Sequence, residues 1–174
     1  RQRDAACDGH CGVLGHGGRH AVRHLPHAGV LCAAALTPRT ASAAGTTGQV
    51  RVFDRQTGAW RQTATLHNPE SGRGFGESLA LSADGRRLAV SALHEAGAVY
   101  LFDLSARDPV QTQQLSAVHG GRGDLFGAAL SLSRDGRWLA TGARLEDGGN
   151  SGIDARLTSA RAPDSGAVYV YAPP

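Results

Sequence analysis

The feature that most constrains the fold of this chain is an eighteen-residue stretch that occurs twice. Residues 75–92 read FGESLALSADGRRLAVSA, and residues 126–143 read FGAALSLSRDGRWLATGA, with eleven of the eighteen positions identical. The two copies lie 51 residues apart. A repeat of this length is typical of a supersecondary unit that cannot bury its apolar surface alone and is stacked on further units. The repetition therefore predicts a repeated structural unit and does not by itself predict a catalytic or binding site.

Each copy has the pattern of a β-hairpin. Small polar residues and Leu alternate in SLALS at 78–82 and in ALSLS at 129–133, which is the period of a half-buried strand. An Asp-Gly pair after such a run favours a tight turn, because Gly tolerates positive φ and Asp accepts hydrogen bonds inside the turn. The second arms are RLAVSA at 87–92 and WLATGA at 138–143.

Five further segments extend the hairpins into larger units. Three begin with Gly and alternate Val with other residues, in a composition that is enriched in strands. They are GQVRVFD at 48–54, GAVYLFD at 97–103 and GAVYVYA at 166–172. Two more fit a fourth strand, WRQTATL at 60–66 and VQTQQLSA at 110–117. The sequence therefore predicts nine strands after residue 45.

Four short antiparallel strands per repeat, at a period of this length, are typical of β-propeller blades. We therefore predict an all-β chain that forms a partial β-propeller of about two four-stranded antiparallel blades. Propellers close with roughly 4 to 8 blades. Such a chain is thus expected to be a fragment, or to assemble with further blades of the same protein or with copies of itself.

Composition divides the chain into two regions. All nine aromatic residues lie after residue 45, and all three cysteines lie before it. Residues 1–45 carry five Arg and two Asp, whereas the remainder carries 13 Arg and 13 acidic residues. We predict a disordered, low-complexity leader rich in Arg, His and Ala at 1–45 and the β-propeller repeats at 46–174. The neutral second region shows no basic patch for nucleic acid, so no nucleic-acid partner is expected.

Two features of the leader have functional readings besides disorder. Cys and His recur at short intervals and are ligand types for zinc or nickel, although their spacing matches no closed structural site. These residues are Cys7, His10, Cys11, His16, His20, His24 and His27. The uncharged run AGVLCAAAL at 28–36 lies between basic residues and ASA at 41–43, which is the order of a secretory signal peptide. The run is shorter than the roughly 20 residues of a membrane span, so no integral membrane segment is expected.

The recurring words resemble the FG-GAP repeat, the unit of integrin-α-type β-propellers and of many secreted bacterial proteins. The pairs that match its FG are Phe75-Gly76 and Phe126-Gly127. Leu93 and Arg144 stand where the repeat has its proline, so the Gly-Ala-Pro part is incomplete. The resemblance covers residues 48–172. It implies a secreted or cell-surface protein that binds a protein or carbohydrate ligand.

In a blade of this kind the recurring residues have structural roles. The Phe is expected to pack between blades, where Gly lets two backbones approach closely. The Gly that opens the third strand suits a tight turn, as does each Asp-Gly pair. The residues with these roles are Phe75, Gly76, Asp84, Gly85, Gly97, Phe126, Gly127, Asp135, Gly136 and Gly166.

Calcium is the cofactor that the resemblance suggests, because integrin-type repeats often hold it in the hairpin turn. Calcium takes six to eight oxygen ligands, usually with several carboxylates. Each hairpin turn of this chain has a single carboxylate, Asp84 or Asp135. Both are weak candidates for a calcium ligand, and we expect no cofactor in these turns.

The connection between the second and third strands differs most between the two copies. It takes four residues after Ala92 and 22 residues after Ala143. Long loops on a rigid scaffold often carry binding sites, and this one is rich in Gly and acidic residues. The candidates for a cation or partner site are Glu146, Asp147, Asn150, Asp154 and Asp164. The alternative is a solvated excursion whose three Arg offset its acids.

No motif of a hydrolase, a zinc protease, a P-loop or a dinucleotide-binding enzyme occurs in the sequence. We therefore predict a non-enzymatic FG-GAP repeat segment of an exported protein, which binds or adheres through its blade loops. This step is an analogy from fold. The alternatives are a fragment of a propeller enzyme whose catalytic residues lie outside this chain, and a WD-repeat-like intracellular scaffold. The FG pairs and the absence of a G-H…W-D signature argue against the scaffold.

Overall fold

The computed structural model describes residues 23–24, 30–35, 48–56, 59–70, 73–118, 120–147 and 162–172 of the chain. Every regular element in these ranges is a β-strand, which confirms the predicted all-β class. The strands are β1 (Arg23–His24), β2 (Val30–Ala35), β3 (Gln49–Gln56), β4 (Ala59–His67), β5 (Phe75–Leu81), β6 (Arg87–Ala92), β7 (Ala98–Asp103), β8 (Val110–Leu115), β9 (Phe126–Leu132), β10 (Leu139–Ala143) and β11 (Ala167–Tyr171). The described ranges contain no helix of the length and hydropathy that crossing a bilayer requires.

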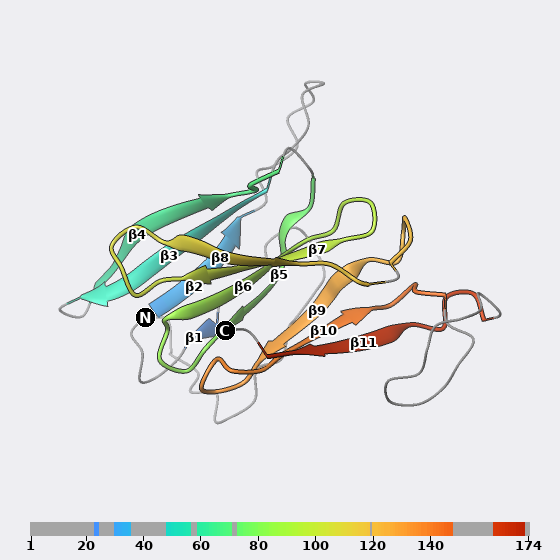
Figure 1. Cartoon of the computed structure of the whole chain (residues 1–174). Coiled ribbons are helices and arrows are strands. Elements are labelled where there is room, and N and C mark those ends of the chain that lie inside the picture. The colour runs from blue at the N-terminus through green and yellow to red at the C-terminus, as the bar shows by residue number, and fades with distance from the viewer. Residues whose placement is uncertain are drawn as a thin grey trace, which may run out of the picture.

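The strands form three antiparallel sheets, each built from strands that follow one another in the chain. The first sheet has the order β1-β2-β3-β4, the second β5-β6-β7-β8, and the third β9-β10-β11. Figure 1 shows the first sheet at the left, the second in the middle and the third at the lower right. From residue 48 on, nine strands lie at the places that the repeat predicted.

The first sheet includes two strands, β1 and β2, from residues 1–45, the region that the sequence predicted to be a disordered leader. β2 pairs with β3 so that Leu31 lies opposite Phe53, and β6 pairs with β7 in the same register, with Leu88 opposite Phe102. β1 and β2 therefore occupy the first two strand positions of a third unit. The sequence pattern does not predict this unit, because residues 25–29 between the two strands contain no Asp-Gly pair. The remainder of 1–45 lies outside the described residues.

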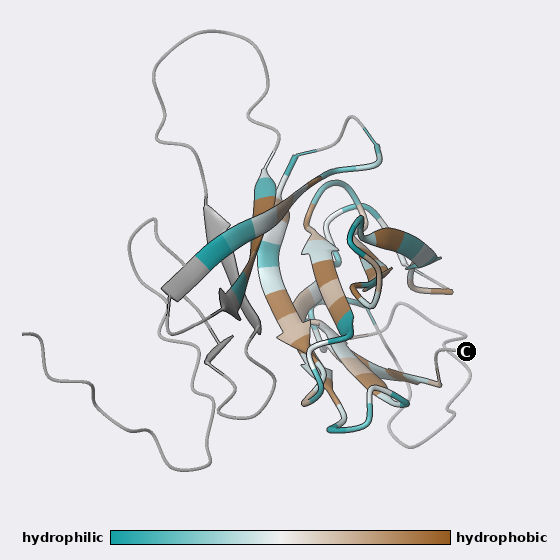
Figure 2. Cartoon of the chain, turned by 90° about the vertical axis from the view of Figure 1, so that its left-hand side faces the viewer, coloured by the Kyte–Doolittle hydropathy of each residue, from teal (hydrophilic) through white to brown (hydrophobic). Residues whose placement is uncertain are grey.

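Two hydrophobic clusters fill the spaces between successive sheets. Alternate residues of β7 point to opposite sides: Tyr100 and Phe102 lie in the cluster shared with the first sheet, and Val99 and Leu101 in the cluster shared with the third. Figure 2 shows such alternation as bands along the strands. We call the side turned toward the next sheet the front face and the opposite side the rear face. Each cluster thus joins the front face of one sheet to the rear face of the next.

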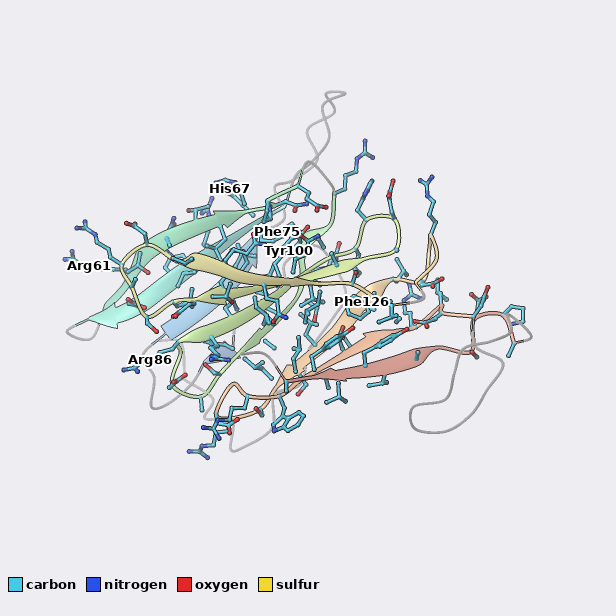
Figure 3. All side chains as sticks on the ribbon, in the orientation of Figure 1. Arg61, His67, Phe75, Arg86, Tyr100 and Phe126 are labelled. Carbon is cyan, nitrogen blue, oxygen red and sulfur yellow. The ribbon has the colours of Figure 1, made fainter. Side chains whose placement is uncertain are left out.

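Aromatic residues of the rear faces anchor both clusters. Phe75 is fully buried, and its ring meets that of Tyr100 edge-on, with the ring centroids 6.0 Å apart; Figure 3 labels this pair. Phe126 takes the same place in the third sheet, and its centroid lies 5.4 Å from that of Tyr169. Edge-to-face pairs contribute about 0.5–1.5 kcal/mol beyond the burial of their area. The Phe of both FG pairs therefore lies between two sheets.

The glycine of each FG pair opens a β-bulge. Strand pairing shifts register directly after Phe75 in the second sheet and after Phe126 in the third. Gly76 and Gly127 have φ of 90° and 95°, which side chains rarely allow. A Cβ on Gly127 would also lie 2.9 Å from the Cβ of Ser91 in the second sheet. Backbone geometry and close packing both require glycine at this point.

Two further glycines bring successive sheets together. Gly48 precedes β3 and Gly97 precedes β7, and a Cβ on either would overlap a main-chain carbonyl oxygen of the next sheet, that of Phe75 or Phe126 respectively. The main-chain N–H of Phe126 also donates a hydrogen bond of 2.9 Å to the carbonyl of Ala96. The same close junction therefore occurs twice in the molecule.

The three sheets do not close into a ring within the described part of the chain. The front face of the third sheet exposes two residues of β11, Val168 at 74% and Val170 at 64%. The structure thus shows three stacked antiparallel sheets, and it does not by itself show a propeller.

Candidate functional site

A tight turn between the second and third strands recurs at the base of the long insertion. In the second sheet the N–H of Gly97 donates to the carbonyl of His94 at 2.9 Å. In the third sheet the N–H of Gly166 donates to the carbonyl of Glu146 at 3.0 Å. The inserted residues are therefore added to a turn of the same form, and the strands that follow start alike.

Positive φ marks the same position in both turns. Glu95 has a φ of 58° and Asp164 a φ of 55°, each two residues before the glycine. Oδ1 of Asp147 accepts a hydrogen bond of 2.9 Å from the N–H of Asp164, and Oγ of Ser165 donates to the carbonyl of Glu146 at 3.2 Å. These bonds hold the two ends of the insertion together, with residues 147–163 as the added segment.

Glu146 is the buried acid at this base. Its side chain is 2% exposed, and its Oε1 accepts a hydrogen bond from the hydroxyl of Tyr169 on β11. Its Oε2 is buried and has no hydrogen-bond partner among the described residues. A buried acceptor left unpaired costs about 1–3 kcal/mol. This oxygen can accept a hydrogen bond from a ligand or contact a cation.

Two tyrosines and a second acid surround Glu146. Burial, and then the hydrogen bond to Glu146, raise the pKa of the Tyr169 hydroxyl. Burial, and then the charge of Glu146, raise the pKa of the Tyr171 hydroxyl. Both phenols therefore stay protonated near neutral pH. The carboxylate of Asp124, which is 9% exposed, adds a further negative charge that acts on Tyr169, so the surroundings favour a cationic or hydrogen-bond-donating group.

The structure places three of the five predicted loop residues at this base and brings Asp147 against Asp164. Asn150 and Asp154 lie outside the described residues. Sequence reasoning missed Tyr169, the partner of Glu146. The sequence could have identified this residue, because Tyr169 stands at the position of Tyr100 in the repeated segment Gly-Ala-Val-Tyr. Asp124 was also missed, although it lies two residues before the second FG pair.

The two Asp-Gly turns are built alike. Oγ of Ser82 donates to Oδ1 of Asp84 at 2.6 Å, and the N–H of Arg86 donates to the same oxygen at 3.1 Å. The second turn repeats both bonds around Asp135 at the same distances. These hydrogen bonds, that of the serine hydroxyl first, lower the pKa of both carboxyls. Each Asp therefore has a sufficient structural role within its turn.

No group of three His, Cys, Asp or Glu side chains that could hold a metal ion occurs within the ranges given above for the structure. Asp84 and Asp135 are the single carboxylates of their turns. The Cys and His set before residue 28, and two of the five loop candidates, lie outside those ranges or have undescribed side chains. A cation or partner site in the insertion therefore stays a hypothesis.

Neither protein-family models nor curated proteins match this sequence. The resemblance of the repeated words to FG-GAP repeats thus stays a prediction from the motifs themselves. Any functional conclusion rests on the geometry around Glu146 and on the three-sheet stack.

Proposed function

We propose that this chain is a non-enzymatic binding segment of the FG-GAP β-propeller kind, and that it binds its ligand at the insertion between β10 and β11. Three stacked antiparallel sheets, with FG pairs between them, support the propeller part of the proposal. The stack supplies the rigid scaffold on which a binding loop is presented.

The observation that carries the binding part is the unpaired carboxylate oxygen of Glu146. This Oε2 is buried at the base of the insertion and lacks a hydrogen-bond partner among the described residues. Buried polar atoms in folded proteins are nearly always paired. A ligand that presents an ammonium, guanidinium or hydroxyl donor would pair this oxygen, and both protein side chains and carbohydrates carry such groups.

Comparison with the second sheet supports a role for the insertion in binding, because the fold forms without an insertion there. There the same strands are joined by the short turn at Glu95, and strand pairing is the same as in the third sheet. Residues 147–163 are therefore not needed to form the turn. A segment that the fold does not need, inserted in the chain directly after a buried acid, is expected to contact a partner.

Binding of the fluorescently labelled full chain to an array of defined oligosaccharides, and to immobilised extracellular matrix proteins, tests the proposal. Wild-type protein is expected to bind a defined subset of one array. Deletion of residues 147–163 keeps the Gly166-to-Glu146 turn, so the fold should survive while affinity falls by about tenfold or more. Glu146→Gln should weaken binding in the same direction, because the amide replaces one acceptor by a donor.

Glu95→Gln is the matched control. Glu95 occupies the equivalent connection of the second sheet, where its side chain is 55% exposed and lies 3.6 Å from the guanidinium of Arg122. This variant should bind as the wild type does. Binding that is unaffected by the deletion, or no binding by the wild type on either array, would contradict the proposal.

The extracytoplasmic location forms part of the same proposal and rests on the FG-GAP resemblance. The apolar run at 28–36, which suggested a signal peptide, contributes β2 to the first sheet. A mature exported protein is therefore expected to retain residues 30–35. N-terminal sequencing of the secreted protein checks this, and cleavage after residue 43 would show that the run is a signal instead.

A further inference from the structure

The front faces of the first and second sheets are covered in the same way. Val50 and Val52 of β3 are 0% and 3% exposed beneath the second sheet. Val99 and Leu101 of β7 are 0% and 4% exposed beneath the third. These positions are equivalent, because β2 and β3 pair with the same offsets as β6 and β7.

The third sheet presents the corresponding face to solvent. β11 pairs with β10 in that same register, so Val168 stands at the position of Val99 and Val170 at the position of Leu101. Their side chains are 74% and 64% exposed. Two apolar residues of one strand face are thus exposed where both preceding sheets bury them.

Trp138 adds to this face. Its place before β10 corresponds to that of Arg87 in the second sheet, whose guanidinium reaches forward and donates to the carbonyl of Gly136 in the third sheet at 3.3 Å. Trp138 is 57% exposed. Neighbouring large apolar side chains on a surface mark an interaction site, whereas isolated ones do not. We call Trp138, Val168 and Val170 the open front face.

We infer that the open front face docks the rear face of the first sheet of a second copy of this chain, so that copies associate head to tail. A second copy is inferred as the partner because its docking would repeat the front-to-rear packing seen between the sheets within the chain. Among the described residues, both interfaces between sheets join the front of one sheet to the rear of the next, and neither joins two front faces. A second copy presents the rear face of its own first sheet, which includes β3.

The rear face of the first sheet carries two described side chains of β3. Phe53, at the position of Phe102, is half-buried, and Arg51, at the position of Tyr100, is exposed. Phe53 thus keeps the phenylalanine of the second sheet, whereas Arg51 places a cation where the second sheet has Tyr100. Docking therefore brings the guanidinium of Arg51 toward the open front face, and this charge makes the interface testable by charge substitution.

The mass of the full chain, measured by sedimentation velocity and light scattering over a range of concentrations, is the first test. The wild type is expected to exceed the monomer mass of 18.0 kDa as concentration rises, and to pass beyond the dimer, because a head-to-tail contact does not close at two copies. Val170→Lys should weaken the association by about tenfold or more, since it places two cations together. Val118→Lys, at an apolar residue 77% exposed outside this face, should leave it unchanged.

Charge complementation is the second test. Val170→Glu should associate more tightly than Val170→Lys, because only the carboxylate pairs with Arg51. Arg51→Glu should restore association when it is combined with Val170→Lys. The double variant Val168→Thr and Val170→Thr keeps the β-branched shape that suits a strand, and it should reduce association with an unchanged circular dichroism spectrum.

Three results would overturn the inference. The first is a monomeric wild type at the highest concentration reached. The second is association that Val170→Lys and the double Thr variant leave intact. The third is a limiting dimer that Val170→Lys and Val170→Glu weaken equally, which indicates a symmetric front-to-front contact.

Discussion

Gly48 and Gly97 show how much of this architecture depends on single backbone positions. Each lies before the third strand of its sheet, and each has the main-chain carbonyl of the next FG phenylalanine in the space of a side chain. Gly166 stands at the same place in the third sheet, where the atom nearest to an added Cβ would be the main-chain oxygen of Arg144, at 3.3 Å. The need for glycine thus follows from the neighbouring sheet as well as from the turn.

Gly48→Ala is expected to destabilise the protein by about 1–3 kcal/mol, because the added methyl overlaps main-chain atoms that cannot rotate away. Urea unfolding measures the change in free energy. Gly142→Ala is the matched control in a strand, since its Cβ would lie 3.9 Å from the nearest atom, the Cβ of Ala129. That variant should be neutral or slightly stabilised. Equal stability of the two variants would show that the first and second sheets do not pack as described.

Tyr169→Phe is expected to lower the free energy of unfolding by about 1–3 kcal/mol. The change removes the donor to Oε1 of Glu146, whose other oxygen already lacks a partner among the described residues. Tyr171→Phe is the control, because its hydroxyl donates to the carbonyl of the exposed Ser116 at 3.2 Å, which water can satisfy. Chemical denaturation of both variants gives the comparison, and a Tyr169→Phe protein as stable as the wild type would remove the buried hydrogen bond from the account.

At the scale of elements, the two Asp-Gly hairpins repeat the same turn structure. Both turns use the same serine hydroxyl, carboxylate and main-chain N–H groups at matching distances. The N–H of Ala83 in the first turn also donates to the carbonyl of Arg134 in the second at 2.9 Å. Each turn therefore shapes its own hairpin, and the hydrogen bond between the two turns helps to align the second sheet with the third.

Stability should fall in acid through these turns. Hydrogen bonds lower the pKa of Asp84 and Asp135 below the usual 3.8, so each carboxylate contributes fully above that value and loses its contribution as pH falls through the lowered pKa. Replacing both by Asn should flatten the dependence of the unfolding free energy on pH below about 4. Asp108→Asn, at an exposed position of the β7–β8 connection, is the control. An unchanged pH profile in the double variant would contradict the role given to the turns.

The nine strands from residue 48 on could be predicted because local signals coincide there. These signals are the alternation of apolar and polar residues, the Asp-Gly turns and the apolar segments that begin with Gly. β1 and β2 could not, since the sequence between them, residues 25–29, contains no Asp-Gly pair and pairing with β3 is a tertiary contact. At the candidate site, the acidic residues could be predicted from the composition of the insertion. The burial of Glu146 and its bond to Tyr169 depend on how β10 and β11 pair, which no local pattern reveals.

At the scale of the whole molecule, stability is shared between neighbours along a row. The second sheet is covered on both faces, with Leu88, Val90 and Val99 all at 0% exposure, whereas the third sheet is covered on its rear face only. Stacked units of this kind owe their stability to nearest-neighbour interfaces. The middle of the row is therefore expected to open last.

Native-state hydrogen exchange should show this gradient. Main-chain amides of β6 and β7 are expected to exchange at least about tenfold more slowly than those of β11, because exchange in the middle needs nearly global opening. The measurement should be made on dilute protein, where copies do not associate. Uniform protection across the three sheets would indicate one cooperative core instead of a row.

The turn between β10 and β11 has a consequence for how proteins of this architecture can diversify. Closing a loop about five times longer costs only about 1–2 kcal/mol of chain entropy. The hydrogen bond from Gly166 to Glu146 across the insertion matches that from Gly97 to His94 in the short turn. Sequence can therefore be gained, lost or exchanged at this point without a change in either hydrophobic cluster. The position is a natural grafting point, where new specificity can evolve or be engineered on an unaltered scaffold.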